Sequence, residues 1–114
     1  RDADDPRLLG HVEPGQRVVL IEDLISTGGS SWAAAEALLA ADARVEAVLA
    51  IFSYGFPEAQ ERFAQLGIPC YSLTNLAALL EVAQAHGLLT EETAKVLTEW
   101  QADPYSWSQA QRML

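Results

Sequence analysis

The 114-residue sequence predicts an α/β fold built on a parallel sheet. Three short apolar runs, at 18–21, 45–52 and 70–73, are typical of buried strands. A helical pattern follows each run, and such alternation favours parallel strands joined by right-handed crossovers. Half of the residues are hydrophobic and 20% are charged, so the composition and the length predict one compact domain.

The first half of the chain divides into four parts. Residues 1–17 are rich in Pro and Gly and predict an irregular lead-in. The strand at 18–21 is expected to end at two acidic residues, Glu22 and Asp23. A helix at 31–41 follows from its Ala and Leu content, and the β-branched run after it predicts the second strand.

The second half reads as a helix, a strand and two further helices. Pro57 suits the first position of a helix, and Gly67 is expected to end it. After the third strand, apolar residues at 76, 79, 80 and 83 recur at helical spacing. The residues expected to cap the last two helices are Thr74 or Asn75, and Thr90. No secondary structure is predicted for the tail at 103–114, and residues 18–102 are expected to form the folded domain.

Composition excludes several classes of function. Seven basic and sixteen acidic residues give a net charge of −9, which argues against a nucleic-acid-binding surface. No apolar run approaches the roughly 20 residues that span a bilayer, so no membrane association is expected. Cys70 is the only cysteine, so it can form no intramolecular disulfide, and its apolar surroundings predict a buried thiol. We expect a soluble, cytoplasmic protein.

Residues 18–30 carry the chemistry. An apolar strand leads to two carboxylates, then to a short loop with hydroxyl side chains and two glycines, and then to a helix. Backbone N–H groups at a helix N-terminus bind anions, and glycine lets a phosphate approach closely. Carboxylates suit sugar hydroxyls, so a ribose bearing a 5′-phosphate would satisfy both ends of the segment. The alternative is a strand tip with solvated acids and a turn that caps a helix. The segment has neither the ending of a Walker loop nor a GxGxxG pattern.

The same segment resembles the 13-residue phosphoribosyl pyrophosphate (PRPP) motif of the type I phosphoribosyltransferases. Within that family, residues 50–56, 71–75 and 100–107 resemble pieces of orotate phosphoribosyltransferases. Ser26 stands where 6-oxopurine enzymes usually place Asp and adenine enzymes Ala, and a Ser or Thr is usual in orotate enzymes. The resemblance implies the parallel-sheet, Rossmann-like core of this family, here its C-terminal part with two extra C-terminal helices.

The resemblance also implies roles for these residues. Glu22 and Asp23 would accept hydrogen bonds from the ribose hydroxyls, and Ser26 could also lie near orotate. The residues that would wrap the 5′-phosphate are Ser26, Thr27, Gly28, Gly29 and Ser30. The family reaction joins orotate to PRPP, with Mg²⁺ on the pyrophosphate, and yields orotidine 5′-monophosphate in pyrimidine biosynthesis. No protein-bound metal site is implied, and the partners are PRPP, orotate and a second subunit in a homodimer.

The sequence departs from the family in two ways. Whole members are nearly twice as long, and the part missing here carries much of the orotate site and the pyrophosphate loop. The family's catalytic lysine belongs to a flexible loop whose remnant would fall within residues 1–17, which contain no lysine. No catalytic residue is therefore assigned. The alternatives are another, purine-type phosphoribosyltransferase and a non-catalytic PRPP-binding regulatory module.

Overall fold

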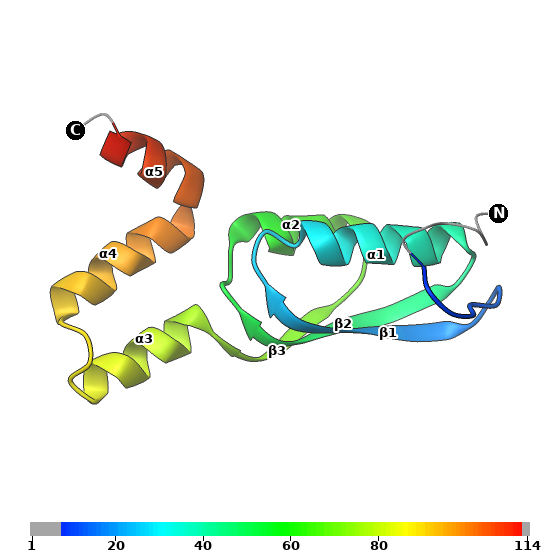
Figure 1. Cartoon of the computed structure of the whole chain (residues 1–114), viewed down its shortest axis with the longest axis horizontal. Coiled ribbons are helices and arrows are strands. Elements are labelled where there is room, and N and C mark those ends of the chain that lie inside the picture. Colours follow the sequence, from blue (N-terminus) through cyan, green and yellow to red (C-terminus); the bar gives the residue numbers. More distant parts are fainter. Residues whose placement is uncertain (1–7, 113–114) are drawn as a thin grey trace.

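A computed structural model describes residues 8–112 of the chain. The first seven residues of the expected lead-in and the last two of the expected tail lie outside this range. Three strands and five helices alternate and then continue as helices only (Figure 1). In chain order they are β1 (Arg17–Ile25), α1 (Gly29–Ala40), β2 (Arg44–Ser53), α2 (Pro57–Leu66), β3 (Cys70–Asn75), α3 (Leu76–Ala85), α4 (Glu91–Ala102) and α5 (Pro104–Arg112).

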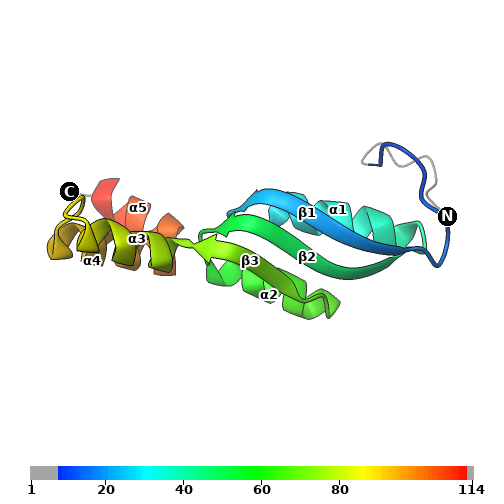
Figure 2. The same cartoon turned by 90° about the horizontal axis from the view of Figure 1, so that it is seen from below.

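The three strands form one parallel sheet in the order β1-β2-β3, which confirms the predicted fold class. Helices α1 and α2 connect consecutive strands and lie on the same face of the sheet (Figure 1). Figure 2, seen from below the view of Figure 1, shows the strands in front of both helices. The sheet is therefore covered on one face, whereas the apolar runs predicted strands buried on both.

The hydrophobic core lies between the sheet and these two helices. Val48 and Phe63 are the largest fully buried side chains, and Ile25 and Ile68 join them in one cluster. Ala35 of α1 is completely buried. Its side chain is small, so the helix can lie close to the strands at this point. The alanine content that predicts the helix therefore also sets how closely it packs.

Several helix ends form as their local signals predict. Gly67 ends α2 with φ 69°, a left-handed conformation that glycine adopts without strain. Asn75 caps α3 by accepting a hydrogen bond of 2.9 Å from the N–H of Ala78. Thr90 caps α4 by accepting one of 3.1 Å from the N–H of Thr93.

The tail contains a helix that the sequence analysis did not predict. Pro104 stands at the first position of α5, and the Asp103 carboxylate accepts a 3.1 Å hydrogen bond from the N–H of Ser106. This bond and the Ser106 side chain lower the pKa of Asp103. An acidic cap followed by proline is a helix start signal, so the Asp-Pro step could have identified α5.

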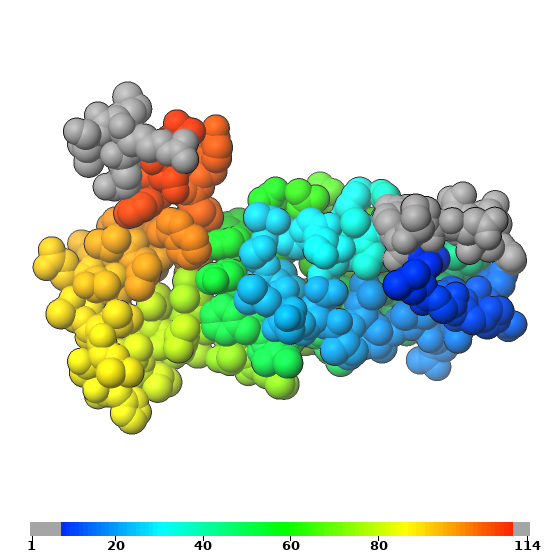
Figure 3. All heavy atoms as spheres, viewed as in Figure 1, coloured from blue at the N-terminus to red at the C-terminus, as the bar shows by residue number. Residues whose placement is uncertain are grey.

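The chain is elongated rather than compact, which corrects the prediction of one compact domain. Its radius of gyration is 17.3 Å and its extents are 51 × 33 × 22 Å, whereas a compact chain of this length has a radius of gyration of about 13 Å. The cause is α3, which leads away from the end of β3 instead of folding back over the sheet (Figure 1). Helices α3 to α5 then form an arm at one end of the α/β layer (Figure 3).

Two further observations bear on the expectations from composition. Cys70 begins β3 at the edge of the sheet and is exposed, so the prediction of a buried thiol is wrong. The partial burial that remains raises the pKa of this thiol. Among residues 8–112, no helix is both long enough and apolar enough to cross a membrane.

Candidate functional site

The candidate site is the junction of β1, the loop at 26–28 and the first turn of α1. Ser26 and Thr27 are exposed, whereas Gly28 is buried. The carbonyl of Gly28 accepts the first helical hydrogen bond, 2.8 Å from the N–H of Trp32. Gly28, the N-cap residue, has no side chain to cap the helix, and the N–H of Gly29 donates a long hydrogen bond of 3.4 Å to the Thr27 hydroxyl. The N-terminus of α1 can therefore attract an anion.

The two glycines of the junction have different environments. Gly28 has φ 82°, and a Cβ added there would lie 3.0 Å from the Cβ of Ala59 and 3.1 Å from its Cα. At Gly29 the nearest atom to an added Cβ would be the hydroxyl oxygen of Thr27, at 3.6 Å. Gly28 is therefore required by the close approach of α2, whereas Gly29 leaves space at the helix N-terminus. Of the two, Gly29 has the open space that the close approach of a phosphate would require.

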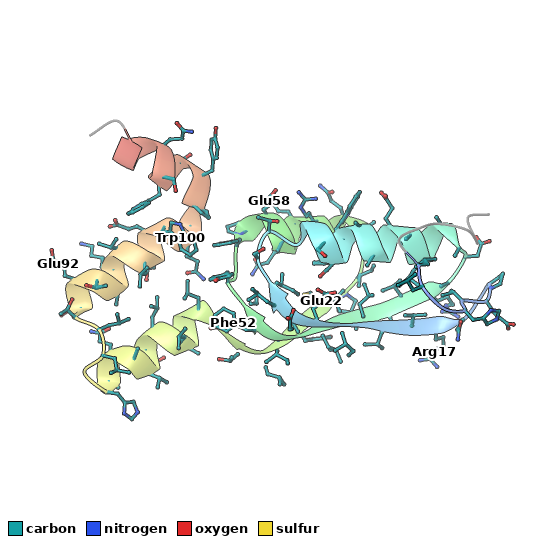
Figure 4. The ribbon with its side chains drawn as sticks, viewed as in Figure 1. Arg17, Glu22, Phe52, Glu58, Glu92 and Trp100 are labelled. Atoms are coloured by element: carbon teal, nitrogen blue, oxygen red, sulfur yellow. The ribbon has the colours of Figure 1, made fainter. Side chains whose placement is uncertain are left out.

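The two carboxylates lie within β1 rather than at its tip. The strand continues to Ile25, four residues beyond the predicted end at Ile21. Successive strand residues point to opposite faces, so Glu22 and Asp23 do not project together from the end of the strand. Glu22 pairs in register with Ala50 and is half-buried, and Asp23 is exposed. Figure 4 shows Glu22 on the ribbon of β1, ahead of the loop.

Both carboxylates are available as hydrogen-bond acceptors. Among the described residues, the arginines that form ion pairs take other partners, because Arg17 pairs with Glu46 and Arg62 with Glu58. Ionised carboxylates accept hydrogen bonds and do not donate them, so a ligand that meets Glu22 or Asp23 must present donors such as hydroxyl groups. A phosphate placed against them would be repelled.

The attraction for an anion comes mainly from the backbone. Arg62 of α2 lies over the Trp32 ring in the first turn of α1, with 5.9 Å between the guanidinium carbon and the ring centroid. Its charge is shared with Glu58, whose carboxylate accepts a 3.0 Å hydrogen bond from it. The amides and the helix dipole at Gly29 therefore form the positive end of the site.

An aromatic cluster stands beside the junction. The rings of Tyr54 and Phe56 stack with centroids 5.3 Å apart, and Trp100 of α4 meets both edge-on, at 5.8 and 5.2 Å. Gln101 donates a 2.6 Å hydrogen bond to the carbonyl of Tyr54. Figure 4 shows Trp100 at the end of α4 that adjoins the α/β layer. The loop between β2 and α2 is thus held by the C-terminal arm.

A pocket of about 420 Å³ opens between the arm and the loop at 26–28. Its walls include Thr27 of that loop, Phe56, and Trp100 and Tyr105 of the arm. In Figure 3 the surface is hollowed between α5, in orange and red, and the green atoms of α2. Neither Trp100 nor Tyr105 was expected at this site, because helical periodicity does not indicate what a distant helix will face.

The described residues contain no group of three or more His, Cys, Asp or Glu side chains arranged to hold a metal ion. Hard oxygen donors close to the loop in the chain are its own hydroxyls and the two β1 carboxylates, and Glu58 and Asp103 line a pocket together with Thr27. Magnesium keeps several water ligands and typically binds through one or two carboxylates together with substrate phosphates. This donor set fits a magnesium ion that arrives with a phosphorylated ligand.

Sequence comparison relates the chain to orotate phosphoribosyltransferases. The one from Bacillus caldolyticus is 43% identical over 107 residues, which cover 94% of this chain and 52% of that relative. Those from Bacillus subtilis and Bacteroides fragilis are 47% and 44% identical, over 85% and 86% of this chain. The chain spans about half the length of the curated relatives it matches. No family model matches it.

Solved structures give the same fold. Leishmania donovani UMP synthase superposes with a TM-score of 0.66 over 82% of this chain and 21% of that one, at 24% identity. Orotate phosphoribosyltransferase from Aeropyrum pernix superposes with a TM-score of 0.55 at 31% identity, over 60% of this chain and 38% of that one. Adenine phosphoribosyltransferase from Leishmania donovani superposes with a TM-score of 0.54 at 30% identity, over 73% of this chain and 34% of that one. The chain therefore has the α/β fold of the type I phosphoribosyltransferases, and in sequence it is similar to the orotate phosphoribosyltransferases over about half of their length.

Proposed function

We propose that this chain supplies the PRPP-binding part of an orotate phosphoribosyltransferase. The observation that carries the proposal is the 41–47% identity to proteins of that name over most of the chain. The open helix N-terminus at Gly29, directly after the loop hydroxyls, supports it as a phosphate site. The reaction would transfer the phosphoribosyl group of PRPP to orotate and release pyrophosphate.

The residues of the junction take distinct roles in this proposal. Ser26, Thr27, Gly29 and Ser30 surround the 5′-phosphate, with Ser26 also near the orotate ring. Gly28 contributes its backbone, because its space is already filled by α2. The ribose hydroxyls donate to Glu22 and Asp23, as the resemblance implies; because these two carboxylates lie on opposite faces of β1, each contact is tested by its own variant.

Magnesium would travel with the pyrophosphate of PRPP and neutralise the charge that develops as pyrophosphate leaves. We assign the PRPP-binding domain to residues 18–102, between the lead-in at 1–17 and the tail at 103–114. The working enzyme in this proposal is a cytoplasmic homodimer, as expected from the resemblance.

The structural comparisons do not select the base. The solved adenine and orotate enzymes match the chain with TM-scores of 0.54 and 0.55 and identities of 30% and 31%. The curated sequence relatives favour orotate. A base-competition assay separates the two: conversion of adenine in preference to orotate would replace this proposal with the purine-type alternative.

The proposal is tested by calorimetric titration of the chain with PRPP and Mg²⁺. Glu22→Gln and Asp23→Asn should each weaken binding about tenfold or more, because hydrogen bonds to charged groups contribute roughly 1.5–3 kcal/mol. Glu81→Gln, an exposed change on α3, is the matched control and should bind like the unmodified chain. If both β1 variants bind PRPP as tightly as the Glu81 control, the ribose assignment is wrong.

A further inference from the structure

The face of the sheet opposite α1 and α2 is an exposed apolar surface. Six side chains from all three strands lie on it, which we call the open face: Val19, Ile21, Leu49, Ile51, Tyr71 and Leu73. Leu73 is 84% exposed and Ile21 70%. No described helix crosses this face in Figure 2.

The register of the strands makes the open face continuous. Ile21 of β1 pairs with Leu49 of β2, and Leu49 pairs with Tyr71 of β3, so these three side chains form one row across the sheet. Ile51 and Leu73 lie two residues further along their strands, on the same side. These five residues line a shallow groove of about 280 Å³.

Such a face is unusual for this kind of sheet. Parallel sheets occur almost only with both faces covered, because each βαβ crossover places a helix on one face and the strands are apolar on both. Contiguous apolar surface of this kind marks an interaction site. The elongated shape also indicates that surface is left uncovered, since the 17.3 Å radius of gyration exceeds the value of about 13 Å for a compact chain of this length.

From this geometry we infer that the open face is the docking surface for the half of the family fold that this chain does not span. The curated relatives extend well beyond the matched region, since the chain covers 52% of one and 45% of another. The outer edge of β1 is also unpaired within the described sheet, so the same half can add a strand there. The inference is the same whether that half belongs to this polypeptide or to another.

The dimensions of the open face specify what would cover it. Three strands spaced about 4.8 Å apart are roughly 10 Å across, which is the diameter of one α-helix with its side chains. The apolar rows extend over about four residues of strand, or roughly 13 Å, which corresponds to about nine residues of helix. The expected contact is one amphipathic helix with an apolar stripe two to three turns long.

The docked helix would lie next to the proposed ribose site. Asp23 lies two residues after Ile21 on β1 and therefore on the open face, and the loop at 26–28 begins three residues after Asp23. The inference therefore rests on the family assignment and deepens the proposed function, because the covering half would also exclude water beside the carboxylate.

The test is co-expression of the chain with the part of the Bacillus caldolyticus relative that lies outside the matched region. We expect the two to purify as a one-to-one complex. Leu73→Asp should weaken the complex roughly tenfold or more, because it places an unpaired charge in an apolar contact. Leu88→Asp is the matched control, because Leu88 is 77% exposed but lies between α3 and α4, away from the sheet.

A second measurement covers the case in which the separate half does not fold. Joining it to this chain as one polypeptide allows the melting temperature to report on docking, and Leu73→Asp should lower it well below the value for Leu88→Asp. Equal effects of the two substitutions in both experiments would overturn the inference. So would self-association of the chain alone that Leu73→Asp abolishes, because the open face would then bind a second copy.

Formation of the complex and catalysis are measured separately, so that the docking surface and the proposed function can fail independently. Orotate turnover and PRPP binding are measured on the same complex. A complex that forms, depends on Leu73 and shows no orotate turnover would support the docking surface and contradict the proposed function.

Discussion

The two glycines of the candidate site should respond in opposite ways to the same substitution. Gly28→Ala places a Cβ 3.0 Å from the Cβ of Ala59 and forces a non-glycine residue to φ 82°. The left-handed conformation costs roughly 1–2 kcal/mol, and overpacking of a close contact costs typically 1–3 kcal/mol. Since a domain of this size has a total stability of about 5–15 kcal/mol, we expect Gly28→Ala to remove roughly 2–5 kcal/mol, a large fraction of it.

Gly29→Ala should leave the fold intact and affect the ligand. The added Cβ meets only the Thr27 hydroxyl, at the ordinary distance of 3.6 Å. Alanine is also favoured over glycine in a helix by up to about 1 kcal/mol. The variant should therefore unfold at the same or a higher urea concentration, while its Cβ occupies the space through which a phosphate approaches the helix N-terminus.

Gly67→Ala provides the matched control for backbone strain. Gly67 has φ 69°, but an added Cβ would meet nothing within 4 Å. Its loss of stability measures the conformational cost alone, and the difference between Gly28→Ala and Gly67→Ala isolates the contact with α2. Urea unfolding gives the stabilities of all three variants, and calorimetry with PRPP and Mg²⁺ gives their affinities.

Two results would refute this reasoning. If Gly28→Ala were no less stable than Gly67→Ala, the close approach of α2 to the loop would not hold in solution. If Gly29→Ala bound PRPP as tightly as the unmodified chain, the phosphate would not lie against the first turn of α1.

Three further predictions concern the arm and the helix caps. Gln101→Leu removes the 2.6 Å hydrogen bond to the Tyr54 carbonyl, so stability should fall by about 0.5–1.5 kcal/mol and amide exchange in the β2–α2 loop should quicken. Asn75→Ala removes the cap of α3 and should cost about 1 kcal/mol in urea unfolding. Hydrogen bonds from Ser106 hold the pKa of Asp103 below its ordinary value of 3.8 in the folded state. The ionised Asp103 carboxylate therefore stabilises α5 fully above pH 3.8, and this stabilisation is lost as the pH falls through the lower pKa of Asp103 in the folded state. Far-UV circular dichroism should show a loss of helix in that pH range, and the Asp103→Asn variant should not show it. Each prediction fails if its variant behaves like the unmodified chain.

The local pattern predicted much of the candidate site. A strand, a loop with hydroxyls and glycines, and a helix can be identified from adjacent residues, because hydrophobic period, turn residues and caps act over a few positions. The same reasoning predicted the caps at Asn75 and Thr90, and the overlooked Asp-Pro step at 103–104 was a signal of the same local kind. One error has a tertiary cause: the strand continues past Glu22 and Asp23, because pairing with β2 overrides their low strand propensity.

What the sequence by itself determined is the order of the elements from β1 to α4, the parallel sheet and the position of the strand–loop–helix segment at 18–30 to which we assign PRPP binding. Only the tertiary structure decided which glycine is required for packing, because Gly28 meets Ala59 about thirty residues away. It also decided that Trp100 and Gln101 hold the β2–α2 loop, that Cys70 is exposed and that one face of the sheet is uncovered. The physical reason is that local signals depend on neighbouring residues, whereas burial and contact depend on which distant elements pack together.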